Sequence, residues 1–242
     1  MSRKLRLFWS RGTGKKGGPR NAGDWYSPLI CEALAERPVV FAPVTQCDLV
    51  AVGSLLDRLQ RSHRWHRLGL RRSLTLWGTG TLRAGDRLAG DHQVLALRGS
   101  ATRARIAAAA PAVPLGDPGL LADRLLLQRP ATRRRLGVVV HQAHLGHPEL
   151  LAAVARQPDA ALLPATLQVR ALLEEIAASE MVLSTSLHGL IFADALAVPN
   201  TWLELPGLDG GRFKFADYYS AFGLELEPLT LATANWDEPV GT

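Results

Sequence analysis

The chain has 242 residues, of which 47% are hydrophobic and 21% are charged. This composition is close to that of ordinary globular proteins and excludes disorder as the main state. The length allows one large domain or two small ones. Two cysteines, Cys31 and Cys47, are too few for a disulfide framework or a four-ligand zinc site, so we expect a reducing, cytoplasmic setting. No apolar run is long enough for a membrane-spanning helix or a signal peptide.

The net charge is +6, and 24 of the 28 basic residues are arginine. High-GC coding favours arginine, alanine, leucine and glycine, and this accounts for most of the excess. Arginine also pairs bidentately with carboxylate and phosphate groups, which favours an anionic ligand. Nucleic acid is not expected as a partner, because aromatic residues make up only 6% of the chain and do not alternate with the basic ones.

Short apolar runs alternate with amphipathic stretches along most of the chain. The runs predict strands at residues 5–9, 49–52, 74–77, 94–97, 136–140, 160–163, 181–183 and 201–205. The amphipathic stretches predict helices at residues 25–35, 100–110, 118–127, 148–156, 166–178 and 187–197. Continuous apolar strands separated by helices indicate parallel sheets that are covered on both faces, which is an α/β architecture.

The segment 128–135 contains Pro130 and has no apolar periodicity, so we interpret it as a linker. We expect an N-terminal Rossmann-like domain at residues 1–128 and a C-terminal one at residues 129–242. These would be two small parallel-sheet domains that face across a cleft, and one continuous sheet is the alternative. In such sheets ligands bind where strands end and helices begin.

Several turns of the first half follow predicted strands. The segment 12–17 matches G-x-G-x-x-G, but the Gly-Pro pair that follows prevents a helix from starting there, so a glycine-rich loop is favoured over a nucleotide site. Asn21 and Asp24 precede the first predicted helix, where capping competes with a role of Asp24 as general base. Arg98 precedes Ser100, which has the place of a helix N-cap, so its guanidinium would lie where an anion binds.

Glycine and small polar residues follow two other predicted strands of this half, as Gly53-Ser54 and as Gly78-Thr79. Glycine at such places allows a ligand to approach the backbone closely. Tight turning alone explains these glycines equally well.

In the second half, His141, His144 and His147 form an H-x-x-H-x-x-H pattern after a predicted strand. No carboxylate or cysteine accompanies the pattern, so we expect no metal. His141, at the end of the strand, is a candidate substrate contact.

The strongest signal is the segment 181–199, in which a strand ends at Ser184, Ser186 caps a helix and His188 lies in the first turn. A helix N-terminus favours a bound anion, and a bound anion would raise the pKa of His188 enough to make it an acid near neutral pH. A structural histidine in a buried turn is the alternative.

These turns, in this order, resemble the polysaccharide pyruvyl transferase family over nearly the whole chain. The matching motifs are Asn21-Ala-Gly-Asp24, Val52-Gly-Ser54, Trp77-Gly-Thr-Gly80, Arg98-Gly-x-x-Thr-Arg103, Gly116-Asp-Pro118 and the segment from Ser184 to Leu196. The resemblance implies a fold similar to GT-B glycosyltransferases. It also implies transfer of an enolpyruvyl unit from phosphoenolpyruvate to two hydroxyls of a saccharide or lipid-linked saccharide, giving a pyruvate ketal. Phosphoenolpyruvate would be the donor substrate, and no bound cofactor is expected.

By this resemblance His188 is the general acid or a phosphate contact, and Arg98 is the main anion clamp, with Arg103 as a weaker second. Lys214 stands where the family also has a basic residue after the histidine motif, so we expect it to reach the donor. Asp24 is the candidate base. The other candidate substrate-binding residues are Asn21, Gly53, Ser54, Gly78, Thr79, His141, Ser184 and Ser186.

Two other classes of function fit the same fold. One is a glycosyltransferase that uses a nucleotide sugar, although the sequence offers no clear carboxylate pair for the ribose. The other is a non-catalytic module that binds a glycan or an anion. An arginine cluster is either a solvated helix face or a peripheral contact with anionic lipid head groups; its members are Arg58, Arg61, Arg64, Arg67, Arg71 and Arg72. Oligomerisation is left open.

Overall fold

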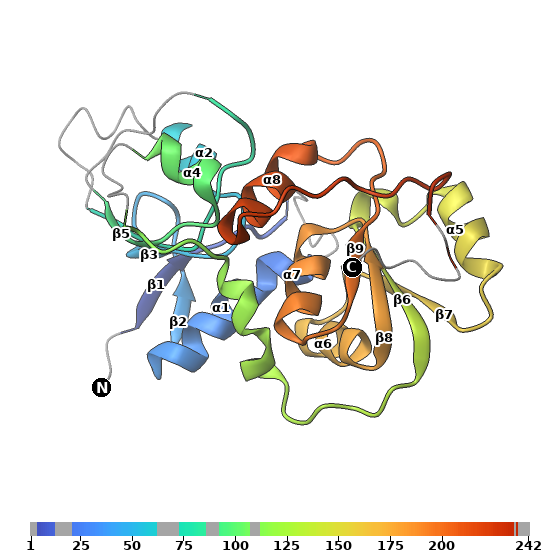
Figure 1. The fold of residues 1–242 in the computed structure, drawn as a ribbon. Coiled ribbons are helices and arrows are strands. Elements are labelled where there is room, and N and C mark those ends of the chain that lie inside the picture. Colours follow the sequence, from blue (N-terminus) through green and yellow to red (C-terminus); the bar gives the residue numbers. More distant parts are fainter. Residues whose placement is uncertain are drawn as a thin grey trace. The chain divides into compact units, whose positions relative to one another are not determined.

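The computed structural model describes residues 4–12, 21–61, 73–85, 92–106, 112–234 and 236. The chain divides into two compact units (Figure 1). The first unit comprises Met1–Arg11, Asp24–Pro118 and Asp209–Leu226, and the second comprises Gly12–Gly23, Gly119–Leu208 and Glu227–Thr242. Each unit has its own sheet with parallel pairing only, so the predicted α/β class is confirmed. The expected domain boundary at residues 128 and 129 stays a prediction.

The first unit contains a five-stranded sheet in the order β2-β1-β3-β4-β5. Its strands are β1 (Leu5–Phe8), β2 (Val39–Phe41), β3 (Leu49–Val50), β4 (Thr75–Trp77) and β5 (Gln93–Ala96). The order shows that the chain adds β2 on one side of β1 and then returns to add β3 on the other side. In open parallel sheets such a reversal leaves a crevice beyond the carboxyl ends of the strands, where ligands bind.

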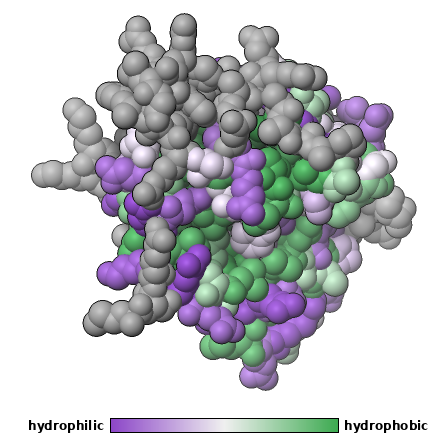
Figure 2. All heavy atoms as spheres, turned by 90° about the vertical axis from the view of Figure 1, so that its left-hand side faces the viewer, coloured by the Kyte–Doolittle hydropathy of each residue, from purple (hydrophilic) through white to green (hydrophobic). Residues whose placement is uncertain are grey.

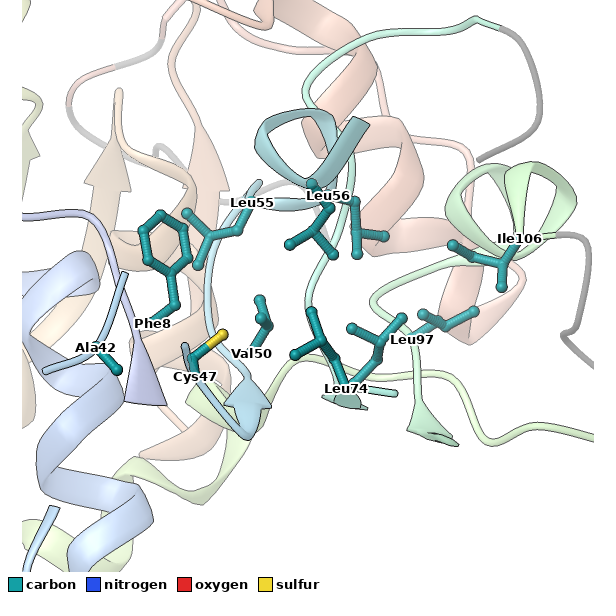
Figure 3. Close-up of a cluster of buried hydrophobic side chains, with 11 residues drawn as sticks. Phe8, Ala42, Cys47, Val50, Leu55, Leu56, Leu74, Leu97 and Ile106 are labelled. Atoms are coloured by element: carbon teal, nitrogen blue, oxygen red, sulfur yellow. The ribbon is translucent and has the colours of Figure 1, made fainter. Parts of the chain in front are cut away.

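Helices cover both faces of this sheet. The helices of this unit are α1 (Ala22–Ala35), α2 (Leu56–Arg61), α4 (Ser100–Arg105) and α8 (Gly211–Tyr219), which is followed by the short 3-10 helix η3 (Ser220–Phe222) and packs on α4. On one face, Leu55 and Leu56 at the start of α2 and Ile106 at the end of α4 pack against apolar strand residues such as Val50 (Figure 3). This buried cluster fixes α2 beside the end of β3.

Helix α1 lies over the other face of this sheet. A groove of about 370 Å3 lies there, lined by Leu34 and Cys31 of α1 and by strand residues such as Leu49 and Leu95. Leu34 is 43% exposed and Leu95 is 48% exposed. Figure 2 shows the side of the molecule on which β5 lies in Figure 1, and apolar residues gather at the centre of this side. Within the described ranges, no helix is long and apolar enough to cross a membrane.

The second unit contains a four-stranded sheet in the order β7-β6-β8-β9, with a similar reversal between β6 and β8. Its strands are β6 (Arg134–Val140), β7 (Ala160–Pro164), β8 (Ser179–Ser184) and β9 (Asn200–Trp202). Its helices are η1 (Pro118–Leu125), η2 (Gln142–His144), α5 (Pro148–Ala155), α6 (Val169–Ala177) and α7 (Leu187–Ala195). Helix α5 packs on one face, while α6 and α7 pack on each other and on β8.

Each predicted strand overlaps an observed one, but some elements differ from the prediction. Strand β2 and helices α2 and α8 were not predicted. The stretch 118–127 forms 3-10 turns interrupted at Leu121. The helix predicted at residues 100–110 ends at Arg105, because the backbone of Ile106 is extended. Residues 107–110 lie outside the described ranges.

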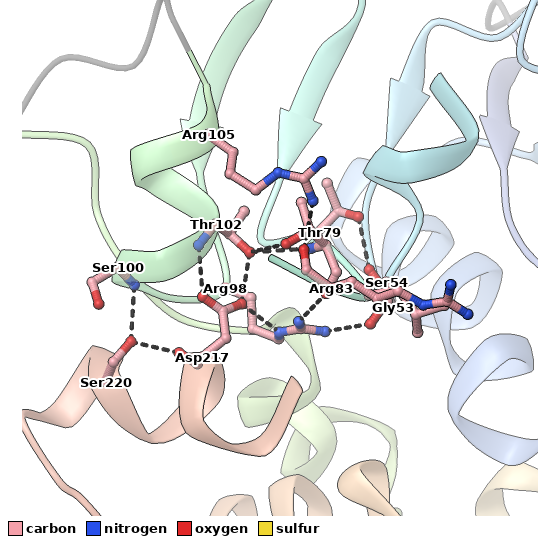
Figure 4. Close-up of polar contacts among 12 residues, drawn as sticks. Gly53, Ser54, Thr79, Arg83, Arg98, Ser100, Thr102, Arg105, Asp217 and Ser220 are labelled. Carbon is pink, nitrogen blue, oxygen red and sulfur yellow. Dashed lines mark hydrogen bonds and ion pairs between the residues drawn. The ribbon is translucent and has the colours of Figure 1, made fainter. Parts of the chain in front are cut away.

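One buried network holds α8 in the first unit (Figure 4). The Asp217 carboxylate accepts hydrogen bonds from the backbone N–H of Thr102 (2.7 Å), from its hydroxyl (2.6 Å) and from Nε of Arg98 (2.9 Å). The side chains of Arg98 and Asp217 are 0% exposed. A Cβ atom added to Gly99 would lie 1.6 Å from the carbonyl oxygen of Asp217, so only glycine allows α8 to come this close.

We expect Asp217→Ala to lower the free energy of unfolding by about 3–5 kcal/mol, because it leaves the Arg98 guanidinium buried without its counter-charge. Asp209 is the matched control, since it pairs with Arg83 where the side chains are 71% and 72% exposed. Asp209→Ala should leave the free energy of unfolding nearly unchanged. Urea unfolding measures both variants, and equal losses would contradict the assigned role of Asp217.

Candidate functional site

The turns at the carboxyl edge of the first sheet are joined by hydrogen bonds. The Thr79 hydroxyl, after β4, donates to the carbonyl of Gly53, after β3, at 2.8 Å. Arg98, after β5, donates from Nη1 to the Ser54 hydroxyl at 2.7 Å (Figure 4). Predicted site residues from three separate turns therefore lie together at this edge. Gly78 ends β4 with a φ of +71° and packs against Pro118, which gives it a structural reason to be glycine.

Arg98 was predicted to be the main anion clamp, and its guanidinium has protein partners on all three nitrogens. In addition to Asp217 and Ser54, its Nη2 donates to the carbonyl of Thr81 at 2.6 Å. Its charge is balanced by a buried carboxylate, so these contacts make Arg98 a residue that joins the turns to α8. Direct contact with a donor stays a prediction.

The turn that follows Arg98 differs from the prediction at the helix start. Gly99 is the N-cap of α4, and Ser100 is the first helical residue, with its N–H donating to the Ser220 hydroxyl at 2.9 Å. The reason is the close approach of α8 to Gly99, which excludes a capping side chain. Arg103 is half-buried in α4, and its N–H donates to the carbonyl of Gly99.

Asp24 lies in the first turn of α1, which begins three residues earlier than predicted. Asn21 precedes the helix and accepts a hydrogen bond from the N–H of Gly23 at 2.9 Å, so Asn21 has the capping role. Burial raises the pKa of Asp24 to about 6, while Ser10 and the charges of Arg58 and Lys214 act to lower it. Asp24 is thus available as a base just below neutral pH.

Lys214 lies in α8 and is only 9% exposed. Its Nζ donates to the carbonyl of Asp209 at 3.0 Å, and in the described part of the chain no carboxylate lies within ion-pair distance. Burial and the charge of Arg98 lower the pKa of Lys214 to about 8, against the charges of Asp209 and Asp24, which raise it. A buried ammonium without an ion pair near a half-buried carboxyl with a raised pKa is an arrangement common at functional sites.

Sequence reasoning missed Ser10 and the site role of Arg58. Nη2 of Arg58 donates to the Ser10 hydroxyl at 3.4 Å. Ser10 lies shortly after the end of β1, as Ser54 lies shortly after the end of β3, and that shared position was a signal available in the sequence. Arg58 had been grouped with the arginine cluster, of which Arg64, Arg67, Arg71 and Arg72 lie outside the described residues.

In the second unit, the turn after β8 lies beside the end of β6. The Ser184 hydroxyl donates to the carbonyl of Ser186 at 2.8 Å and accepts from its N–H at 3.0 Å. Ser186 is the N-cap of α7, as predicted, although its side chain makes no capping hydrogen bond. The N–H of His141 donates to the Thr185 hydroxyl at 2.9 Å, which brings His141 to this turn.

His188 is the second residue of α7 and is half-buried. Its ring centroid lies 5.7 Å from that of Phe192, with the planes tilted by 43°. A Cβ atom added to Gly23 would lie 2.2 Å from Nδ1 of His188. The N–H of Ala22, next to Gly23, donates to the carbonyl of Ala165 at 2.7 Å, which holds this segment in place. The glycine of the Asn21–Asp24 motif therefore makes room for the imidazole.

The three histidines of the H-x-x-H-x-x-H pattern have separate partners. Nδ1 of His141 accepts from the N–H of Ala143, Nε2 of His144 is bonded to the carbonyl of Pro206, and Nδ1 of His147 accepts from the N–H of Leu150. Among the residues that the structure describes, no group of three histidine, cysteine or carboxylate side chains is placed to hold a metal ion.

The candidate residues fall into two groups, one in each unit. The group of the first unit is Asp24, Gly53, Ser54, Gly78, Thr79, Arg98, Arg103 and Lys214, and that of the second is Asn21, His141, Ser184, Ser186 and His188. That both groups face one cleft stays a prediction.

We expect Gly23→Ala to displace the His188 ring, because the new methyl group would occupy the place of Nδ1. If His188 serves catalysis, activity should fall at least tenfold with a smaller change in melting temperature. Gly146→Ala is the control, since its Cβ would meet nothing within 4 Å. The proton NMR signals of His188 report its displacement directly, and unchanged signals in Gly23→Ala would contradict the packing argument.

Two comparisons with known proteins bear on the family of the chain. The family model described as Polysaccharide pyruvyl transferase matches residues 2–205. The chain is also 26% identical over 224 residues to a protein of Acanthamoeba polyphaga mimivirus named Uncharacterized protein L143; the match covers 86% of this chain and 72% of the relative. The viral relative's name assigns no activity, so the family match carries the conclusion. The chain belongs to the polysaccharide pyruvyl transferase family, and its activity class is pyruvyl transfer to a saccharide.

Proposed function

We propose that the protein transfers the enolpyruvyl unit of phosphoenolpyruvate to two hydroxyl groups of a saccharide and forms a cyclic pyruvate ketal. One observation supports this beyond family membership: Lys214 is buried without an ion pair in the described residues, beside the half-buried Asp24. Burying an unpaired ammonium is unfavourable for folding. An anionic substrate that supplies the missing charge gives the arrangement a function.

Phosphoenolpyruvate carries a carboxylate and a phosphate, so it needs cations and N–H donors. We assign one anionic group to Lys214 and the other to His188, in the first turn of α7. Arg98 acts through other residues: it orients the Ser54 hydroxyl and, through Asp217, the helix that carries Lys214. Arg98 is thus a positioning residue in this proposal.

In the proposed reaction, the imidazolium of His188 gives a proton to the methylene carbon of phosphoenolpyruvate, and C2 becomes cationic. A sugar hydroxyl attacks C2 while the Asp24 carboxylate takes its proton. The C2–O bond to phosphate then breaks, and phosphate leaves with the electron pair and the proton held by Asp24. A second hydroxyl attacks C2 to close the ketal ring, and its proton restores the imidazolium.

The acceptor is a saccharide, which we propose to be either free or lipid-linked. A cytoplasmic location, a peripheral contact with a membrane and an oligomeric state belong to the proposal as expectations. Asn21, Gly53, Thr79, Arg103, His141, Ser184 and Ser186 are assigned to shaping the site. A glycosyltransferase that uses a nucleotide sugar is the competing function.

The first test is to incubate the protein with phosphoenolpyruvate and a panel of glycosides. We expect phosphate release that depends on a glycoside, together with a mass gain on the sugar. Lys214→Met should raise the KM for phosphoenolpyruvate about tenfold or more, because a charged contact to the donor is lost. Thermal stabilisation by nucleotide sugars, with none by phosphoenolpyruvate, would instead support the glycosyltransferase.

The second test uses the pH dependence of kcat/KM. Asp24 acts as a base only above its pKa of about 6, and Lys214 is charged only below its pKa of about 8. The profile should therefore be highest between about pH 6 and pH 8. Asp24→Asn should lower the rate by about 10²–10⁴-fold.

Asp24→Asn should also stabilise the fold at neutral pH. The pKa of Asp24 is higher in the folded protein than its ordinary value, so the ionised carboxyl opposes folding above about pH 6. Removing that charge should raise the free energy of unfolding by about 1–3 kcal/mol there, and the gain should fade as the pH falls toward 4. A loss of both activity and stability would indicate a structural role for Asp24.

A further inference from the structure

We propose that the Ser54 hydroxyl donates a hydrogen bond to the phosphate group of the donor, and that the buried Arg98 guanidinium acts on the donor through this hydroxyl. The inference rests on the proposed function, which supplies phosphoenolpyruvate as the donor, and it adds a binding residue to that function. Ser54 is the group that touches the substrate, and Arg98 positions it.

The Arg98 guanidinium is closed to direct contact with a ligand. Its side chain is 0% exposed, and its nitrogens donate to the Asp217 carboxylate, to the carbonyl of Thr81 and to the Ser54 hydroxyl (Figure 4). Gly80 packs against it as well, because a Cβ atom added there would overlap Cζ of Arg98. Asp217, Thr81 and Gly80 are buried, whereas Ser54 is half-buried. A ligand can therefore meet this group of residues at Ser54.

The direction of the hydrogen bond between Arg98 and Ser54 follows from the chemistry of the two groups. A guanidinium only donates, so the serine oxygen accepts at 2.7 Å and keeps its own proton for a second partner. In the described part of the chain, that proton has no acceptor within hydrogen-bond distance. The charge of Arg98 also polarises the hydroxyl, which strengthens any hydrogen bond that the hydroxyl donates. Ser54 is thus prepared to donate to an anion.

Ser179, in the second unit, shows a serine whose hydroxyl is used within the protein. The Ser179 hydroxyl accepts from Nη1 of Arg134 at 3.5 Å and donates to the carbonyl of Glu175 at 2.9 Å. Ser179 is also buried, with 4% of its surface exposed. Both serines accept from an arginine, but only the Ser179 proton is taken up by a carbonyl of the described residues. This difference indicates a ligand contact for Ser54 and a structural role for Ser179.

Ser54 lies beside the proposed base. It follows Gly53 in the turn after β3, and β3 adjoins β1 at the reversal of the sheet, where ligands bind in open parallel sheets. A Cβ atom added to Gly53, which has a φ of +100°, would lie 3.8 Å from Oδ1 of Asp24. In the proposed reaction Asp24 gives its proton to the leaving phosphate, so the phosphate must lie against Asp24. For this reason we assign Ser54 to the phosphate and not to the carboxylate of the donor.

The experiment measures the binding of phosphoenolpyruvate and of inorganic phosphate by isothermal titration calorimetry. We expect Ser54→Ala to raise the Kd for both probes about tenfold or more, because a hydrogen bond to a charged group is lost. Ser54→Thr keeps the hydroxyl and should bind both probes nearly as well as the wild type. Pyruvate has a carboxylate but no phosphate, so its Kd should be the same for the wild type and Ser54→Ala. A Kd that rises for pyruvate and not for inorganic phosphate would overturn the assignment.

Ser179→Ala is the matched control, since it also removes a hydroxyl that accepts from an arginine. It should leave the Kd values of both probes unchanged. The melting temperature is measured for every variant, and all titrations are made well below it, so that unfolding does not contribute to the Kd. If Ser54→Ala does not fold, Ser54→Cys takes its place, because a thiol fills the same position but is a much weaker donor.

The outcomes separate this proposal from the proposed function. Equal Kd values for the wild type and Ser54→Ala would overturn the role of Ser54, even if turnover fell in the variant. Weaker binding of both probes to Ser54→Ala, in a protein that transfers nothing from phosphoenolpyruvate to glycosides, would support the role of Ser54 and overturn the proposed function. A wild-type protein that binds neither probe would overturn both.

Discussion

The buried ion pair of Arg98 and Asp217 is the interaction on which the site of the first unit depends. The two residues are 119 positions apart in the chain, and both side chains are fully buried. An ion pair in such a place stabilises a fold only when its remaining donors and acceptors are satisfied. Here Ser54, Thr81 and Thr102 satisfy them. Lys214 is three residues before Asp217, on the same side of α8, so anchoring Asp217 also fixes Lys214.

The same ion pair explains why we assign a structural role to Arg98 and donor binding to Lys214. Arg98 is neutralised by Asp217, whereas Lys214 donates to the carbonyl of Asp209, lies over the Phe215 ring and has no ion pair among the described residues. The Arg98 charge still reaches Lys214 and, after burial, is the main influence that lowers its pKa. Arg98 thus has a structural role in the fold, and its charge also lowers the pKa of Lys214. A bound anion would interact more strongly with Lys214 than with Arg98, because no carboxylate is paired with Lys214 in the described part of the chain.

Much of the fold followed from the sequence because buried parallel strands are short apolar runs. Residues that follow such runs, such as Arg98 and His141, could be located for the same reason. Helix α8 could not be predicted, because Lys214 and Asp217 are buried with Phe215 and Tyr218, and this removes the apolar periodicity that identifies a helix. The pairing of Arg98 with Asp217 could not be predicted either, since Asp217 lies in α8. A cation after a strand resembles a ligand contact until its distant carboxylate is known.

The charges around Asp24 suggest why the proposed base would need a cation of its own. A bound anionic donor raises the pKa of every titratable group near it. For Lys214 this is favourable, because the ammonium is the form that binds. For Asp24 it is unfavourable, because protonation removes the base when the donor arrives. The charge of Arg58 opposes this effect, and it comes from α2 rather than from the helix that carries Lys214. Because Arg58 is not assigned to the donor, its charge would continue to lower the pKa of Asp24 after the donor has bound. Different cations would then serve donor binding and proton transfer.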